Sequence, residues 1–235
     1  MKWEGRFSSP ERKREYVRGL FSTIAPRYDL ITVLLSFGQD RRWKRRLASL
    51  HDPAGKSALD LACGTGDLAY EIARRGARRV IGLDITRSML ELASAKREAE
   101  RVAFVTGDMM ALPFPDAAFD LITTGYGLRN VPVLDTALRE AARVLKGGGV
   151  LLSLDFNKPD NRVMRRIYLS YLSVVGSIVG AMLHADPDTY RYIPESIKRY
   201  PGGEGVRSAA LRAGFAGCEI FPVLGGLMTI HRAVK

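Results

Sequence analysis

A glycine turn flanked by two acidic residues is the part of this sequence that could bind a ligand. Asp60 precedes the turn Gly64-Thr65-Gly66, and Asp84 follows a second apolar run further along the chain. Backbone N–H groups in such a turn, with the positive end of the helix that follows, can face a polar ligand. A carboxylate before the turn can hold an aminoacyl ammonium group, and one after the second run can accept from both hydroxyls of a ribose.

The spacing Gly64-x-Gly66-x-x-Ala69 also matches the loose dinucleotide fingerprint, so the glycines alone do not separate NAD from another adenosine cofactor. The acids favour S-adenosylmethionine, because a carboxylate beside a pyrophosphate would repel it. The structural alternative is an ordinary tight turn with a capping aspartate.

Apolar runs alternate with segments of helical period through the middle of the chain. Strands are predicted at 58–61, 79–83, 102–105, 119–123 and 150–154, and helices between them at 88–98 and 133–145. Such repeats predict a parallel sheet with helices on both faces and a ligand at the carboxyl ends of the strands. Five polar residues fall at those ends, which favours one shared site: Asp60, Asp84, Asp108, Thr123 and Asp155.

Two further pairs of residues lie where side chains can face a ligand. Asp108 and Met109 follow the third predicted strand, and a carboxylate beside an apolar methionine suits the amino group and ring of an adenine. A simple turn residue is the alternative for Asp108. Tyr28 and Asp29 lie on a predicted turn after the first of three helices expected within residues 11–50, where they either face a pocket or anchor and cap a helix.

Residues 167–183 carry no charged side chain, and Arg162, Arg165 and Arg166 stand just before them. A helix that is apolar on all sides needs cover on every side, or an apolar ligand. The favoured interpretation is a buried lid helix, and the alternatives are a groove for a lipid tail or contact with an anionic bilayer surface. The run is too short and too rich in serine and glycine to predict a membrane span.

The composition is that of a globular protein with a basic balance. Of 235 residues, 46% are hydrophobic and 26% charged, and 36 lysines and arginines against 25 acids give a net charge of +11. The length predicts one sizeable core. Two distant cysteines, Cys63 and Cys218, rule out a disulfide framework or a metal site with cysteine spacing and favour a reducing cytoplasm. The first residues lack the apolar segment of a secretory signal.

The end of the chain predicts a helix at 206–213 and two strands, 218–224 and 227–233, joined through Gly225-Gly226. A two-residue glycine link is a strong hairpin signal. An antiparallel pair that closes a parallel sheet is typical of class I methyltransferases and differs from the usual NAD domains.

Motifs spread in order over nearly the whole chain carry a resemblance. The most specific is Gly127-Leu128-Arg129-Asn130-Val131-Pro132. Others lie at 21–29, 36–43, 60–67, 112–116, 190–197, 200–202 and 213–215, at Lys158-Pro159 and at His231. Together they resemble the ubiquinone/menaquinone biosynthesis C-methyltransferase family.

The resemblance implies an α/β class I S-adenosylmethionine-dependent methyltransferase, Rossmann-like, with a mostly parallel seven-stranded sheet and a C-terminal antiparallel hairpin. A single domain is expected to span residues 1–235. Within it we expect a helical cap at 1–50, a cofactor-binding core at 51–156, a helical substrate lid at 157–205, and a closing helix and hairpin at 206–235.

By the same resemblance, the reaction is methylation of a ring carbon of a reduced polyprenyl quinol, demethylmenaquinol or the benzoquinol of the ubiquinone pathway. The cofactor residues are expected to be Asp60, Gly64, Thr65, Gly66, Asp84, Asp108, Met109 and Gly125, the last where some relatives have serine. Arg129 is a cation for the phenolate, and its alternatives are to hold the cofactor carboxylate or to form a structural salt bridge. Asn130 can orient a water or the ring oxygen, and Tyr28 can close the pocket. Arginine stays protonated, so a water relay or Asp155 would take the proton.

The chain departs from the family pattern at three places, and the second of them, at a strand end near the substrate, leaves the exact quinone open. Lys146-Gly147-Gly148-Gly149 replaces the commoner Lys-Pro-Gly-Gly, Asp155-Phe156-Asn157 stands where Glu-Phe-Ser is usual, and Thr32 stands where asparagine is frequent. The alternatives are another prenylated phenol or aromatic as acceptor, an NAD oxidoreductase, and a basic nucleic-acid-binding module. We expect no nucleic-acid partner, because no reading motif accompanies the basic clusters. A homodimer and a transient visit to the membrane surface are also expected.

Overall fold

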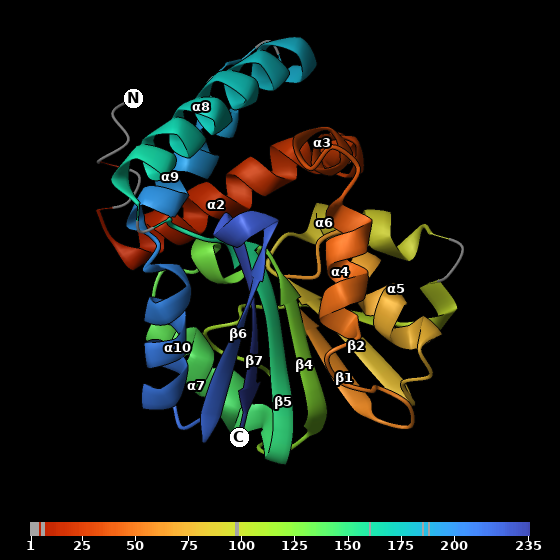
Figure 1. Cartoon of the computed structure of the whole chain (residues 1–235). Helices are drawn as coiled ribbons and strands as arrows, with labels where there is room; N and C mark the ends of the chain where they lie inside the picture. The colour runs from red at the N-terminus through yellow and green to blue at the C-terminus, as the bar shows by residue number, and fades with distance from the viewer. Residues whose placement is uncertain (1–4, 6–7, 97–98, 160, 185, 188) are drawn as a thin grey trace.

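A computed structural model describes residues 5, 8–96, 99–159, 161–184, 186–187 and 189–235. A seven-stranded sheet with the order β3-β2-β1-β4-β5-β7-β6 forms the centre of the molecule (Figure 1). All neighbouring strands pair in parallel except β7, which is antiparallel to β5 and β6. The strands are β1 Ser57–Leu61, β2 Arg79–Asp84, β3 Ala103–Thr106, β4 Phe119–Gly125, β5 Leu145–Phe156, β6 Gly217–Val223 and β7 Met228–Val234.

Helices cover both faces of the sheet, because side chains along each strand alternate between two apolar clusters. In β1, Leu59 and Leu61 pack into the cluster that contains α7 (Leu134–Val144) and α10 (Gly202–Arg212). Ala58 packs on the opposite side, with α4 (Asp40–Ala48) and α5 (Asp67–Arg74). The helix α6 (Arg87–Ser94) contacts β2 and β3. This is the expected Rossmann-like arrangement with a closing antiparallel pair.

A third group of helices lies above the end of the sheet where the site is found. Figure 1 shows α2 (Pro10–Ile24), α3 (Tyr28–Leu35), α8 (Arg162–His184) and α9 (Tyr192–Arg199) gathered there. The start of α2 follows from its sequence: the Ser9 hydroxyl accepts from the Arg12 N–H and Pro10 occupies the first helical position. Segments from both ends of the chain therefore come together over the glycine turn.

Two expectations about the second half of the chain are wrong. The link between β6 and β7 has four residues, Leu224 to Leu227, and includes a short 3₁₀ turn, because Gly225 and Gly226 both adopt left-handed backbone angles inside it. The favoured interpretation of the 167–183 run as a helix buried on every side also fails. In α8 only Tyr168, Leu172, Gly176 and Gly180 are buried.

Candidate active site

A cavity of about 700 Å³ lies at the carboxyl ends of the parallel strands. Its walls come from the loops after β1 to β4 and from α2, α3 and α6. Among the predicted cofactor residues, Gly64, Asp84, Asp108, Met109 and Gly125 line it. Asp60, Thr65 and Gly66 are not among its lining residues. The structure therefore brings most of the predicted cofactor residues to one cavity.

Asp84 fastens the glycine turn to the second strand. Its two carboxylate oxygens accept from the backbone N–H groups of Gly64 and Thr86, each over 2.8 Å. Burial raises the pKa of Asp84, against the effect of these donors. At Gly66 the backbone is left-handed, and an added Cβ would lie 2.8 Å from the ring of Tyr70, so only glycine allows this approach. The carboxylate keeps free lone pairs on the cavity side, where ribose hydroxyls could donate.

Asp60 has an unused acceptor inside the protein. The Thr123 hydroxyl donates to its Oδ1 over 2.7 Å, and its Oδ2 is buried with no hydrogen-bond partner. Burial raises the pKa of this carboxyl to about 7. A buried acceptor without a donor costs stability, which a cationic ligand group beside it would relieve. Asp60 does not line the cavity, so its predicted contact with the ammonium group stays a prediction.

Asp60→Asn is expected to stabilise the protein more at pH 8 than at pH 4. The folded carboxyl has its pKa near 7, whereas an unfolded aspartate titrates near 3.9, so the folded state alone holds this proton between those values. The wild type therefore loses up to about 4 kcal/mol as pH rises through this window, and asparagine does not. Urea unfolding of both proteins at several pH values measures the difference; a difference that is constant with pH would contradict the assignment.

Asp108 already has partners at the far end of the cavity. Its Oδ1 accepts from the Met110 N–H over 2.8 Å, and its Oδ2 lies 2.9 Å from Nε of Arg14 in α2. Arg14 thus crosses the mouth of the cavity from a helix more than ninety positions earlier in the chain. An adenine amino group would have to share Asp108 with it. Sequence reasoning missed Arg14 because it belongs to a basic cluster that resembles a solvated helix face.

Arg129 and Asp155 form a buried ion pair at the carboxyl end of β5. Nε of Arg129 lies 3.0 Å from Oδ1 of Asp155, and the Arg129 backbone N–H donates to Oδ2 over 3.1 Å. Asp155 is completely buried and lines neither cavity, and burial raises its pKa against the effect of Arg129. The structure therefore places Asp155 behind Arg129, where it holds the guanidinium rather than facing an acceptor.

Asn130 is also committed to positioning Arg129. Its side-chain oxygen accepts from Nη1 of Arg129 over 3.1 Å and from the Tyr192 hydroxyl over 2.9 Å, and its amide donates to the Tyr126 carbonyl over 2.7 Å. Nη1 also donates to the Ser196 hydroxyl over 3.1 Å. None of the described residues accepts a hydrogen bond from Nη2 of Arg129, so this nitrogen remains a donor for a ligand.

A second, apolar cavity of about 1340 Å³ lies between the N-terminal helices and the lid. Arg129 is its one positively charged lining residue among those described. Aromatic and aliphatic side chains form most of the remaining wall, among them Ile24, Ile31, Trp43, Phe156, Tyr168, Leu172 and Tyr190. The Arg129 guanidinium lies 4.9 Å from the centre of the Phe156 ring, a cation–π contact. Such a cavity suits a long apolar ligand with an oxyanion at one end.

Phe21, Tyr28 and Tyr126 line both cavities, so the two meet at these rings. Burial raises the pKa of Tyr28, so its hydroxyl stays a neutral donor at this boundary. Tyr126 adopts φ of 62°, in the left-handed region that favours glycine. Strain of this kind is concentrated at functional sites. Sequence reasoning did not single out Tyr126. Its place directly before the specific 127–132 motif could have indicated it.

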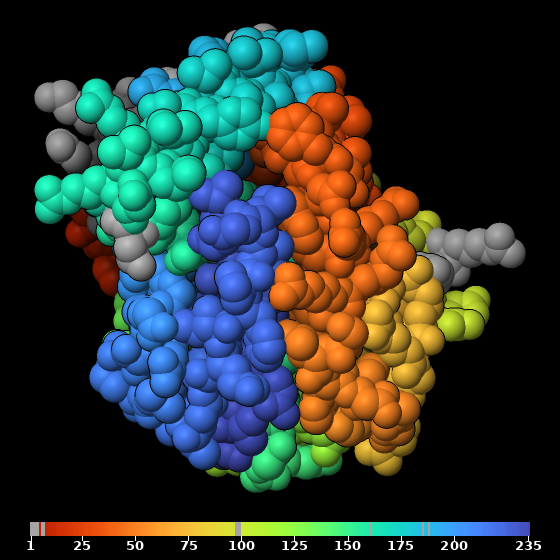
Figure 2. Space-filling view, viewed as in Figure 1, coloured from red at the N-terminus to blue at the C-terminus, as the bar shows by residue number. Residues whose placement is uncertain are grey.

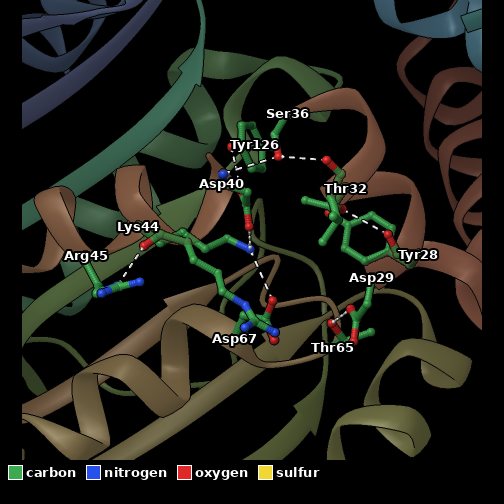
Figure 3. Close-up of polar contacts among 12 residues, drawn as sticks. Tyr28, Asp29, Thr32, Ser36, Asp40, Lys44, Arg45, Thr65, Asp67 and Tyr126 are labelled. Carbon is green, nitrogen blue, oxygen red and sulfur yellow. Dashed lines mark hydrogen bonds and ion pairs between the residues drawn. The ribbon is translucent and has the colours of Figure 1, made fainter. Parts of the chain in front are cut away.

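A buried lysine joins the helix α4 to the glycine turn (Figure 3). Nζ of Lys44 lies 2.6 Å from Asp40 and 3.4 Å from Asp67, the first residue of α5. Burial acts to lower the pKa of Lys44, but the two carboxylates outweigh it and raise the pKa above its usual value. The Tyr126 hydroxyl donates to the other oxygen of Asp40 over 2.7 Å.

The same chain of contacts continues to the N-terminal helices. Lys96 lies 2.8 Å from Asp67 and 3.0 Å from Asp29. Asp29 in turn accepts from the Thr65 hydroxyl over 2.6 Å, as Figure 3 shows. Alternating charges therefore run from the boundary of the two cavities to the turn itself. The Thr65 hydroxyl is therefore part of this network. Asp29 binds the glycine turn through it and does more than cap a helix.

Comparison with known proteins decides between the remaining classes of enzyme. Residues 9–235 match the ubiE/COQ5 methyltransferase family. The chain belongs to this family. It is 37% identical to the ubiquinone/menaquinone biosynthesis C-methyltransferase UbiE of Shewanella sp. (strain W3-18-1), over 96% of this chain and 92% of that protein. It is 42% identical to the demethylmenaquinone methyltransferase of Thermus thermophilus, over 84% of this chain and 91% of that protein.

The fold of this family member is that of S-adenosylmethionine-dependent methyltransferases. A solved structure of such an enzyme from Thermotoga maritima superposes with a TM-score of 0.69 at 18% identity, over 93% of this chain and 99% of that one. The predicted fold class, the methyltransferase activity and the expected cofactor, S-adenosylmethionine, are confirmed. These matches exclude the alternative that the protein is an NAD oxidoreductase.

Proposed function

We propose that this methyltransferase transfers the methyl group of S-adenosylmethionine to a ring carbon of a reduced polyprenyl quinol. The observation that carries the proposal is the contact between the two cavities: the cofactor cavity shares Tyr28 and Tyr126 with an apolar cavity that has Arg129 in its wall. The related proteins are named for menaquinone and ubiquinone biosynthesis. Demethylmenaquinol is the acceptor we favour, with the ubiquinone-pathway benzoquinol as a second substrate.

Three residues of the cavity wall would hold the cofactor. Asp84 would accept from the ribose hydroxyls, and Asp108 and Met109 would contact the adenine. When bound, S-adenosylmethionine supplies an electrophilic methyl group on a sulfonium. At Gly125 an added Cβ would lie 3.8 Å from Leu68, so the serine of some relatives would also fit here.

The protein's own task is to make the ring carbon nucleophilic and to align it. A quinol carbon gains that character when the neighbouring hydroxyl loses its proton. Nη2 of Arg129 would stabilise the phenolate, in a site whose walls are largely apolar. Asp155 and Asn130 would hold the guanidinium in place. Because Arg129 stays protonated and Asp155 is buried behind it, we propose that a water relay carries the hydroxyl proton to solvent. After methyl transfer the ring carbon loses its own hydrogen as a proton to the phenolate oxygen, which restores the quinol.

Mass analysis of the product tests the proposal. Purified protein is incubated with S-adenosylmethionine and either chemically reduced demethylnaphthoquinol or demethylated benzoquinol. Methylated naphthoquinol is the expected product. Product from the benzoquinol alone would contradict demethylmenaquinol as the acceptor and assign the enzyme to the ubiquinone pathway. Bound S-adenosylmethionine without product from either quinol would contradict the acceptor and favour another prenylated phenol or aromatic.

Three properties of the whole protein go with this proposal. We infer that it works in the cytoplasm and visits the inner face of the membrane, because a polyprenyl quinol resides in the bilayer. A homodimer remains a prediction. No nucleic-acid partner is proposed.

A further inference from the structure

The outer face of α8 carries a continuous apolar stripe. Its members recur at helical spacing and are all exposed, from 39% for Tyr171 to 78% for Met182: Val163, Ile167, Tyr171, Val174, Ile178 and Met182. A stripe of this length at i, i+4, i+8 spacing is one face of the helix. In Figure 2 the side chains of α8 cover the upper surface of the molecule. Monomeric soluble proteins rarely leave such a face uncovered.

The inner face of the same helix is fixed to the domain. An added Cβ at Gly176 would lie 3.2 Å from Tyr190, and one at Gly180 would lie 2.5 Å from the Asp186 carbonyl, so the two glycines allow close packing. Tyr168 and Leu172 are buried with Ile197 of α9. The helix therefore lies side-on over the domain and turns only one face outward.

The apolar surface continues onto the neighbouring helix α3. Phe37, just after α3, is 75% exposed, and its ring stacks on Tyr171 with 6.5 Å between centroids. Leu30, Val33 and Leu34 of α3 are also exposed. Phe37 and Tyr171 both line the apolar cavity as well. The exposed patch thus reaches the wall of the cavity in which the acceptor would bind.

A basic hollow adjoins the start of the stripe. Arg162, Arg165, Arg166 and Lys198 line it, together with Ser170 and Ser173. Lys198 pairs with Glu195 over 2.6 Å, whereas no ion pair joins the three arginines to any residue that the structure describes. Guanidinium groups and hydroxyls in one hollow match the phosphate oxygens of lipid headgroups.

We propose that this face, α8 with the end of α3, docks on the surface of an anionic phospholipid bilayer. The apolar stripe enters the acyl boundary and the three arginines meet the headgroups, as in other interfacial helices. By length and composition α8 could also cross a membrane. Its inner face belongs to the protein core, which favours an orientation in the plane of the surface. The inference rests on the proposed function for its purpose, delivery of a prenylated acceptor to the apolar cavity.

Vesicle flotation tests the docking without any turnover. The full-length protein is expected to float with vesicles that contain phosphatidylglycerol and much less with pure phosphatidylcholine. Ile167→Gln/Val174→Gln/Ile178→Gln should weaken binding to both, by about tenfold or more. Arg162→Gln/Arg165→Gln/Arg166→Gln should weaken binding to the anionic vesicles by roughly 100-fold, about fivefold for each arginine.

A matched control removes the same charge from another surface. Arg139, Arg207 and Arg212 are exposed on α7 and α10, which Figure 1 places far from α8. Their triple change to glutamine should leave most of the binding intact. Equal binding by all variants, or no binding by the wild type, would overturn the proposal. So would a dimer in solution that the Ile167/Val174/Ile178 variant abolishes, because a second copy would then cover this face.

Activity toward a short-tailed, water-soluble quinol separates the two proposals. The glutamine variants of α8 change no residue that lines the apolar cavity, so they should keep wild-type activity in solution. Vesicle binding without methylation of any quinol would leave the docking face intact and refute the proposed function. Methylation of a quinol without vesicle binding would support the proposed function and refute the docking face.

Discussion

Arg129→Met is expected to lower kcat by about 10²- to 10³-fold, the usual cost of removing one donor to a developing oxyanion. The same change should lower the free energy of unfolding by about 3–5 kcal/mol, because it leaves the carboxylate of Asp155 buried without its cation. Single-turnover kinetics with the reduced quinol measures the first effect, and urea unfolding measures the second.

The double variant Arg129→Met/Asp155→Asn separates chemistry from stability. It removes the buried charge together with its partner, so most of the lost stability should return. The rate should not return, because no cation faces the apolar cavity. Recovery of kcat in the double variant would show that Arg129 acts only through the fold, and would refute its assigned role.

Asp84→Ala is expected to weaken S-adenosylmethionine binding by about 10²-fold or more. Charge-assisted hydrogen bonds of about 1.5–3 kcal/mol each would be lost at the ribose. The N–H groups of Gly64 and Thr86 would also lose their acceptor, which loosens the turn. Isothermal titration with S-adenosylmethionine measures the affinity.

Asp108→Ala is the matched control for Asp84→Ala. Asp108 already shares its carboxylate with Arg14, so its loss should weaken binding less, by about tenfold. Circular dichroism and thermal unfolding show whether each variant is folded. Unchanged affinity in a folded Asp84→Ala protein would contradict the ribose assignment.

The sheet and the cofactor cavity could be predicted because their signals are local. The predicted parallel strands are short apolar runs with a polar residue at or near the carboxyl end, as with Asp60 before Leu61 and Asp84 after Leu83. Parallel strands place those ends at one edge by topology alone. Of the five polar residues predicted from this pattern, Asp84 and Asp108 line the cofactor cavity, and neither needed any knowledge of side-chain packing. Asp60, Thr123 and Asp155 line neither cavity.

The second cavity and the orientation of Arg129 depend on contacts that no local pattern contains. Asp155 ends a strand as predicted, but its burial behind Arg129 follows from how β5 meets the 127–132 segment. Ser196 and Tyr192 come from the lid, which packs only after the sheet has formed. The uncharged run predicted burial, and only the tertiary structure shows that one face of α8 stays outside.

Lys44 illustrates the same limit for charge. In the sequence it stands in a basic cluster, where solvated side chains are the usual outcome. In the fold Asp40 precedes it by one helical turn, and Asp67 arrives from the glycine turn, so the lysine is buried between them. The sequence shows how many charged residues a segment has. Which of them form ion pairs depends on which helix packs against which loop.

The rings shared by the two cavities connect the two substrates energetically. Phe21 and Tyr28 line both cavities, so each ligand would contact rings that also form the wall of the other ligand's cavity. A ligand that fixes these rings lowers the entropy cost of binding for the other ligand. Thermodynamic reciprocity then requires that the quinol tighten S-adenosylmethionine binding by the same factor as the converse. Positive cooperativity between donor and acceptor is therefore the expected consequence of the shared wall.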